Sequence, residues 1–160
     1  MMKFLFNKRL IIIYLSMLFV PQICEAQTVS VIRNLSFGNI YFTGSGGSIS
    51  VSNTGSVTTT GTVGLFASSP TPTTAIIRVY AGRNSRFTWG LSYSSTITLN
   101  RTKGGSVTVT LTDTDPSGWF VIPKDSSIDF SIGGKMTVRS ISYNPGGYYS
   151  GTFTVTLNYF

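Results

Sequence analysis

The chain has 160 residues, of which 12 are Lys or Arg, five are Asp or Glu and none is histidine, so its net charge at pH 7 is +7. The lack of histidine excludes serine–histidine and cysteine–histidine dyads as well as histidine-ligated metal sites. The basic residues are scattered and form no stripe with aromatic residues, so we expect no nucleic-acid binding.

The N-terminal segment 1–26 has the pattern of a secretory signal peptide. A basic start precedes the apolar run Leu10–Val20, and Cys24 and Ala26 stand at the −3 and −1 positions of a cleavage site before Gln27. The apolar run is too short for a comfortable transmembrane span. We therefore predict a cleaved signal peptide at 1–26 and export to the periplasm, the cell surface or the exterior. After cleavage we expect no stable membrane span.

Removal of the segment 1–26 leaves the range 27–160, whose length predicts a single domain. Cys24 is the only cysteine and leaves with the signal peptide. No disulfide, zinc–thiolate site or cysteine nucleophile can then form, and no cofactor is expected. The domain must be stabilised by packing and strand pairing.

Strand patterns fill this domain in chain order. Apolar residues alternate with Ser, Thr and Gly, or gather in short runs, at 29–35, 49–65, 76–80, 87–93, 97–99, 107–111, 120–122, 128–132, 136–138 and 153–159. Clusters of Gly, Pro and Asn interrupt them at 44–47, 53–55, 69–72, 104–105, 115–118, 133–134 and 144–147. Strands spaced about 8 to 15 residues apart are typical of an antiparallel sandwich. We predict an all-β, immunoglobulin-like antiparallel β-sandwich.

Five motifs stand in order between residues 35 and 159. They are Leu35–Ile40 (LSFGNI), a Gly-rich turn before Ile49–Ser52, Gly104–Leu111, Ile132–Val138 (IGGKMTV) and Pro145–Tyr159. As a set they resemble the bacterial domain of unknown function DUF4402, whose ending is shared with pilin-like and spore-coat-U-like secreted domains. The resemblance implies an immunoglobulin-like sandwich related to fimbrial subunits, without a defined activity.

The last predicted strand alternates strongly. One face carries Phe153, Val155, Leu157 and Tyr159, and the other carries threonines and an asparagine. We expect the apolar face to point into the core. Two interpretations fit this strand: ordinary packing in a self-complete sandwich, or an edge that pairs with a strand of another molecule.

The resemblance to fimbrial subunits implies an N-terminal segment that completes a neighbour's sandwich. Only Gln27–Asn34 precedes the first motif, and eight residues span at most about 28 Å. Val29 and Val31 alternate whereas Ile32 is out of phase, so this donor segment is short and irregular. The leading hypothesis is an exported structural protein, a fimbrial-type or surface-associated subunit that pairs strands with like subunits. A periplasmic chaperone and usher are the partners that this hypothesis implies.

The alternative hypothesis is a monomeric secreted module that binds surface glycans. Arg83, Arg86 and Trp89, around the loop 81–85, are its candidate contacts for an anionic ligand. A solvated loop explains the same arginines.

An enzyme is not expected. The domain has four carboxylates, at Asp113, Asp115, Asp125 and Asp129. The first three are predicted in turns, and Asp129 is predicted to point outward from its strand. Asp113 and Asp115 alone do not provide the six to eight oxygens that calcium takes, so no metal site is predicted.

Overall fold

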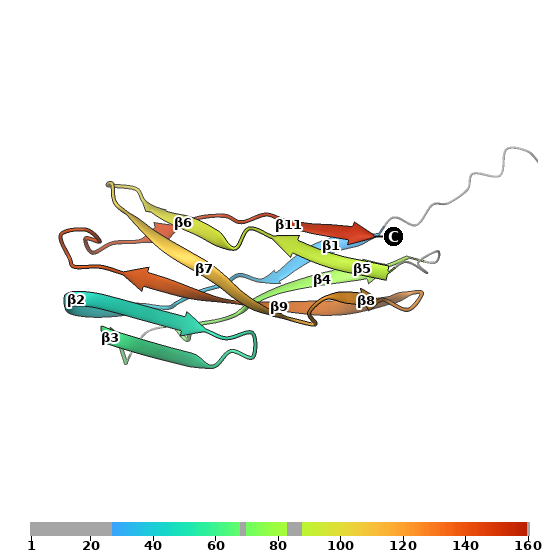
Figure 1. The fold of residues 1–160 in the computed structure, drawn as a ribbon, viewed down its shortest axis with the longest axis horizontal. Helices are drawn as coiled ribbons and strands as arrows, with labels where there is room; N and C mark the ends of the chain where they lie inside the picture. The colour runs from blue at the N-terminus through green and yellow to red at the C-terminus, as the bar shows by residue number, and fades with distance from the viewer. Residues whose placement is uncertain (1–26, 68–69, 83–87, 160) are drawn as a thin grey trace, which may run out of the picture.

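The structure is a computed structural model that describes residues 27–67, 70–82 and 88–159 (Figure 1). The predicted signal peptide lies outside the described residues. Within the described ranges, no helix is long and apolar enough to cross a membrane.

Regular structure in the described residues consists of antiparallel β-strands. They are β1 (Thr28–Arg33), β2 (Ile40–Val51), β3 (Val57–Leu65), β4 (Ala75–Ala81), β5 (Thr88–Tyr93), β6 (Thr96–Arg101), β7 (Ser106–Asp115), β8 (Trp119–Val121), β9 (Ser126–Val138), β10 (Tyr149–Ser150) and β11 (Val155–Tyr159). The alternating Val, Ile and Thr side chains of these segments suit a pleated surface that is buried on one face.

The strands form two sheets. The larger has eight strands in the order β1-β4-β9-β7-β6-β10, with β2 beside the second half of β9 and β3 beside β2. The smaller has three strands in the order β11-β5-β8. The predicted all-β, immunoglobulin-like sandwich is confirmed.

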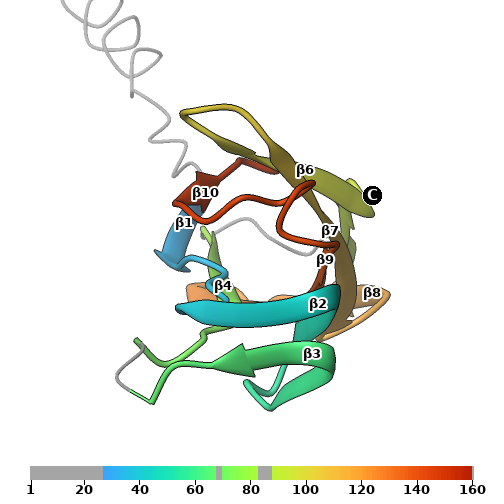
Figure 2. The ribbon, with the colours of Figure 1, turned by 90° about the vertical axis from the view of Figure 1, so that its left-hand side faces the viewer.

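The chain passes repeatedly from one sheet into the other. β5 runs into β6 across Ser94 and Ser95, β7 is followed by β8 and β8 by β9, and β10 is followed by β11. Strands that switch sheets in this way make the corners of a sandwich. Figure 2, a view along the length of the molecule, shows the ribbons curling around a common interior.

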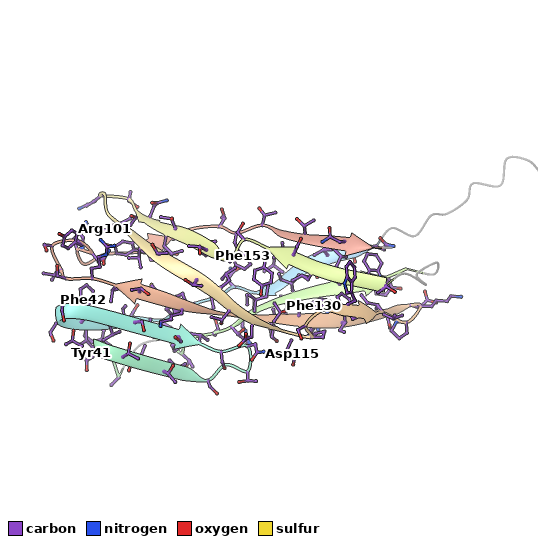
Figure 3. The ribbon with its side chains drawn as sticks, in the orientation of Figure 1. Tyr41, Phe42, Arg101, Asp115, Phe130 and Phe153 are labelled. Atoms are coloured by element: carbon purple, nitrogen blue, oxygen red, sulfur yellow. The ribbon has the colours of Figure 1, made fainter. Side chains whose placement is uncertain are left out.

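The core lies between the two layers. Its largest fully buried side chains are Trp89, Phe130, Ile49, Ile122, Ile132, Val51, Val79 and Val109. The ring of Phe130 packs against that of Phe120 with centroids 4.5 Å apart. Figure 3 shows Phe130 and Phe153 directed into the space between the sheets.

Two glycine clusters that were predicted to interrupt strands lie inside them. Gly133 and Gly134 are in the middle of the 13-residue strand β9, and residues 44–47 lie within β2, where the pairing with β3 shifts register. At Gly133 a Cβ atom would lie 2.6 Å from the carbonyl oxygen of Val51. This glycine therefore allows two backbones to approach closely and does not end a strand.

The predicted turn at Asp113 and Asp115 is also wrong. Both residues lie in β7, which continues to Asp115 with a register shift against β9 between Leu111 and Thr114. A β-bulge keeps an irregular segment within the ladder. Asp125, by contrast, lies in the predicted turn, with a φ of 55° that aspartate tolerates better than most residues.

Candidate strand-pairing site

The C-terminal strand β11 is an edge strand of the smaller sheet. Val155 lies opposite Tyr93 and Leu157 lies opposite Leu91, both on β5. Phe153, Val155 and Leu157 are half-buried and pack against the core, so the predicted apolar face does point inward. Phe153 precedes the strand, in the stretch 151–154 between β10 and β11. Tyr159 is the last residue of β11 and lies opposite Trp89, but its side chain is outside the described set.

The N-terminal strand β1 is the edge of the larger sheet. It pairs with β4, where Val29 lies opposite Val79 and Val31 lies opposite Ile77. Directly opposed residues in an antiparallel pair point to the same face, so Val29 and Val31 point to the core side of the sheet. The register shifts between Val31 and Arg33, which makes Ile32 the extra residue of a bulge and explains why it is out of phase.

The core-side valines of β1 are poorly covered. Val29 is 55% exposed and Val31 is 66% exposed, although their partners Val79 and Ile77 are buried. All six residues of β1 are exposed. The core face of the sheet is therefore buried at β4 but open to solvent at the neighbouring strand β1.

The open side of the sandwich is the flank between β1 and the β10–β11 segment. β1 and β11 overlap along this flank in Figure 1, and Figure 2 shows β1 next to β10, whereas the C mark at the end of the chain lies across the molecule from β1. Each successive neighbour from β1 through β4, β9, β7 and β6 to β10 is antiparallel. Five antiparallel steps make β1 and the β10–β11 segment run in opposite directions. Among the described residues, β1 pairs with β4 alone and β11 with β5 alone.

Neither edge strand is blocked by lysine, proline or an inward-pointing charge, although β1 has the bulge at Ile32. Natural edge strands are commonly blocked by lysine, proline or an inward-pointing charge. The β11 sequence, VTLNY, has no charged residue and no proline. The β1 sequence, TVSVIR, has one charge, at its last position. Both edges therefore retain backbone groups that can extend the sheet.

Of the three predicted glycan contacts, the structure describes Trp89 alone. Arg83 and Arg86 lie outside the described residues. Trp89 is 1% exposed, because it lies on the core face of β5, so the prediction that it contacts a ligand is wrong. The alternation along β5 places Trp89 on the same face as Leu91 and Tyr93, which is the face that packs inward.

The described carboxylates do not gather into a metal-binding cluster. Among residues 27–67, 70–82 and 88–159, no group of three or more His, Cys, Asp or Glu side chains could hold a metal ion. Asp129 points outward from β9, as predicted, and accepts two hydrogen bonds from Arg78 of β4, at 2.6 Å from Nε and 2.7 Å from a terminal nitrogen. These hydrogen bonds lower the pKa of Asp129 and raise that of Arg78.

Asp129→Asn is expected to lower the melting temperature slightly at pH 7, and the difference from the wild type should vanish as the solution is acidified. The folded pKa of Asp129 is depressed, so its contribution is present above the unfolded value of about 3.9 and is lost as the pH falls through the folded pKa. Both side chains are partly exposed, so the effect should be small and should shrink in high salt. Melting curves from pH 2 to 7 check this.

Asp113→Asn removes the same charge from an exposed position on β7 and serves as the control. A difference between Asp129→Asn and the wild type that persists at pH 2 would show that the carboxylate acts through something other than its charge.

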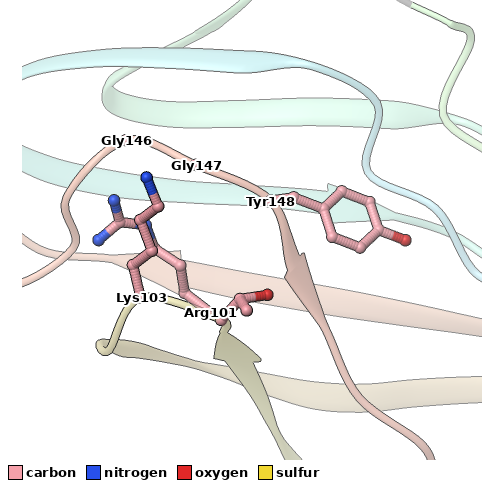
Figure 4. A pocket seen from close by; sticks show the side chains of 6 residues that line it. Arg101, Lys103, Gly146, Gly147 and Tyr148 are labelled. Atoms are coloured by element: carbon pink, nitrogen blue, oxygen red, sulfur yellow. The ribbon is translucent and has the colours of Figure 1, made fainter.

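The sequence interpretation missed one group of residues altogether. Arg101, Thr102 and Lys103 from the end of β6 and the β6–β7 turn meet Gly146, Gly147 and Tyr148 from the β9–β10 loop. We call these six residues the basic tip. They line an open pocket of about 350 Å³ at the end of the sandwich opposite to the C-terminus (Figures 3 and 4). The only local signal in the sequence was the pair Arg101 and Lys103 next to the Gly-Gly turn. This pair does not indicate that the β9–β10 loop, far along the chain, completes the pocket.

Comparison with protein-family models matches residues 27–159 to the domain of unknown function DUF4402. The chain belongs to the DUF4402 family. Comparisons with curated proteins and with solved structures find no significant match.

The DUF4402 match begins at Gln27, so it includes β1 as well as the motifs that start at Leu35. In the sequence interpretation, Gln27–Asn34 was an extension in front of the family's first motif. The structure instead pairs most of this segment with β4 as a strand of the domain. Two of the family motifs also meet: a Cβ atom at Gly134 would lie 2.8 Å from a methyl carbon of Leu35 and 3.5 Å from the ring of Phe37.

Proposed function

We propose that this DUF4402 protein is an exported structural subunit, of the fimbrial or surface-associated kind, that assembles by β-strand pairing along its open side. The observation that supports the proposal most directly is the exposure of Val29 and Val31, whose cross-strand partners are buried. A strand added at this side would cover apolar side chains of β1 that the domain leaves in water.

The geometry of the two edges constrains the added strand. Since β1 and the β10–β11 segment run in opposite directions, a strand entering between them is parallel to one edge and antiparallel to the other. Its main-chain groups would pair with the backbone of an exposed edge, and alternate side chains would contact Val29 and Val31 at β1 or Val155 and Leu157 at β11. The partner in this proposal is a like subunit, or a periplasmic chaperone that holds the same edge before assembly.

The alternative hypothesis, a glycan-binding module, used Trp89 as a ligand contact, but Trp89 is buried. The open side therefore has the stronger support as the functional surface.

Thr156→Lys is expected to reduce assembly and leave the fold intact. Thr156 is exposed on β11, and a lysine on an edge strand opposes the approach of another strand. The measurement is the size distribution of protein purified from cells that express the full chain, by sedimentation velocity and by electron microscopy of negatively stained filaments. The wild type should form oligomers or filaments, and Thr156→Lys should shift the protein to monomer.

The matched control is Thr108→Lys, which places the same charge at an exposed position of β7, a strand paired on both sides by β6 and β9. It should assemble like the wild type. A wild-type protein that stays monomeric at high concentration and refolds reversibly without a chaperone would contradict the proposal.

A further inference from the structure

The basic tip is built by two segments that are held together by specific contacts. The β6–β7 turn closes with hydrogen bonds from the Gly104 amide to the Arg101 carbonyl and from the Arg101 amide to the Gly105 carbonyl, both 3.0 Å long. In the β9–β10 loop, the hydroxyl of Tyr149 donates a hydrogen bond of 2.7 Å to the Pro145 carbonyl.

Asn144 ties this loop to the body of the domain. Its side chain is buried, donates a hydrogen bond of 2.7 Å to the Ser106 carbonyl and accepts one of 2.6 Å from the Arg139 amide. The two segments of the tip are therefore fixed in place before any ligand arrives, which lowers the entropy that binding must overcome.

Two glycines, Gly146 and Gly147, form part of the pocket lining. At Gly147 a Cβ atom would lie 2.4 Å from Nε of Arg101, so the guanidinium stem packs directly on this glycine, whereas a Cβ atom added at Gly146 would meet no atom within 4 Å. Figure 4 shows Arg101 and Lys103 lining the pocket beside the Gly146–Gly147 backbone, while Tyr148 extends to the other side. Two cationic groups thus border a pocket whose lining includes the backbone of two glycines.

The positive charge at this end has no acidic counterpart nearby in the sequence. Neither 96–112 nor 130–159 contains an aspartate or glutamate, whereas they contribute Arg101, Lys103 and, in the same loop, Arg139. The nearest acidic residue along the strands, Asp113, is seven residues from the start of β7, or roughly 23 Å in an extended strand. The Debye length at physiological ionic strength is about 8 Å, so this carboxylate does not neutralise the tip.

Two exposed tyrosines lie at this end of the domain. Tyr148 is 81% exposed and borders the pocket, and the ring of Tyr143 lies under the guanidinium of Arg139, 5.8 Å from its centroid. A tyrosine ring combines an apolar face with a polar hydroxyl, which suits contact with a sugar ring. A volume of about 350 Å³ is near the lower limit of ligand pockets, about 300–1,000 Å³, so the hollow fits one sugar unit of a longer chain.

We propose that the basic tip binds an acidic polysaccharide, with a sugar carboxylate between Arg101 and Lys103 and a sugar ring against Tyr148. The open end of the pocket lets the rest of the polymer continue over the surface, where Arg139 meets further carboxylates. This site lies at the end of the sandwich and does not depend on strand pairing at the open side. A subunit that pairs strands along its flank would carry one such site per copy, so weak single contacts would add up along an assembly.

The experiment measures binding of oligogalacturonate to protein purified from cells that express the full chain, by isothermal titration calorimetry at 150 mM salt. Lys103→Gln should weaken the affinity by about tenfold, because it removes a hydrogen bond to a charged group. Tyr148→Ser should weaken it as well, whereas Tyr148→Phe, which keeps the ring, should bind within a factor of about two of the wild type. Lys103 and Tyr148 are exposed, so these variants should fold, as a melting curve verifies.

The matched control is Lys124→Gln, which removes an equal charge from an exposed turn before β9. Equal losses in Lys103→Gln and Lys124→Gln would mean that net charge alone attracts the polymer, and would overturn the proposal. So would a wild type that fails to bind oligogalacturonate, or one that binds uncharged dextran equally well. Two results together would show that the basic tip is a simple anion site: competition by inorganic phosphate at millimolar concentration, and unchanged oligogalacturonate binding by Tyr148→Ser. They would contradict the proposal that the tip binds a polysaccharide.

Discussion

Replacing Phe130 with alanine is expected to lower the free energy of unfolding by about 3–5 kcal/mol. Phe130 is fully buried in the middle of the longest strand and packs against Phe120, so its removal leaves a cavity between the two sheets. A typical domain has a stability of about 5–15 kcal/mol in total, so this loss approaches the whole margin if the domain is at the low end. Urea denaturation followed by tryptophan fluorescence measures the change.

Phe130→Leu is the matched control, since it keeps an apolar side chain at the site and should cost only about 1–2 kcal/mol. A loss below about 1 kcal/mol for Phe130→Ala would mean that the sheets close over the vacated volume. Such a small loss would contradict the idea that the contact between Phe130 and Phe120 fixes the distance between the two sheets.

Gly133→Ala is expected to lower the free energy of unfolding by about 2–3 kcal/mol, although it adds a single methyl group. The new Cβ atom would lie 2.6 Å from the Val51 carbonyl oxygen and 2.9 Å from the Asn53 nitrogen, and both are backbone atoms that no side-chain rotation can move. Gly133 sits where the edge of β9 changes partner, from β4 at Ile132 to β2 at Gly134. The end of β2 must therefore shift away from β9 to make room.

Gly146→Ala adds the same methyl group in the β9–β10 loop, where nothing lies within 4 Å, and should leave stability within about 0.5 kcal/mol of the wild type. The measurement is the urea midpoint of each alanine variant, compared at equal m-value. The difference between the two midpoints gives the loss of stability caused by the steric clash at β9. Equal midpoints would show that β2 and β9 are not in close contact at this point.

The two proposed surfaces of this DUF4402 domain arise from different features of the fold. The open side exists because the sheet that continues from β9 through β4 to β1 has no described strand to cover the core face of its last member. The basic tip exists because the β6–β7 turn and the β9–β10 loop leave the sandwich at the same end. Changes at Thr156 and at Lys103 should therefore act independently, the first on assembly and the second on polysaccharide binding.

Local pattern was sufficient for the class of fold and for the direction of many side chains. A period of two determines which face of a strand is apolar, so Val155, Leu157 and the outward position of Asp129 could be predicted without a structure. The phase error at Ile32 was visible in the sequence as well, and the structure identifies it as a bulge. The absence of histidine was likewise enough to exclude histidine chemistry.

Tertiary structure alone decided the rest, because these features depend on residues that are far apart in the chain. The Gly-Gly pair at 133–134 looks like a turn locally, and only the approach of Val51 and Leu35 shows that it belongs inside a strand. Trp89 follows a loop in the sequence, but the packing of β5 buries it. Arg101 and Tyr148 lie far apart in the sequence and share a pocket only because β6 pairs with β10. Side-chain alternation is a property of a few neighbouring residues, whereas edges, pockets and close backbone contacts are properties of strand order, which short-range pattern does not specify.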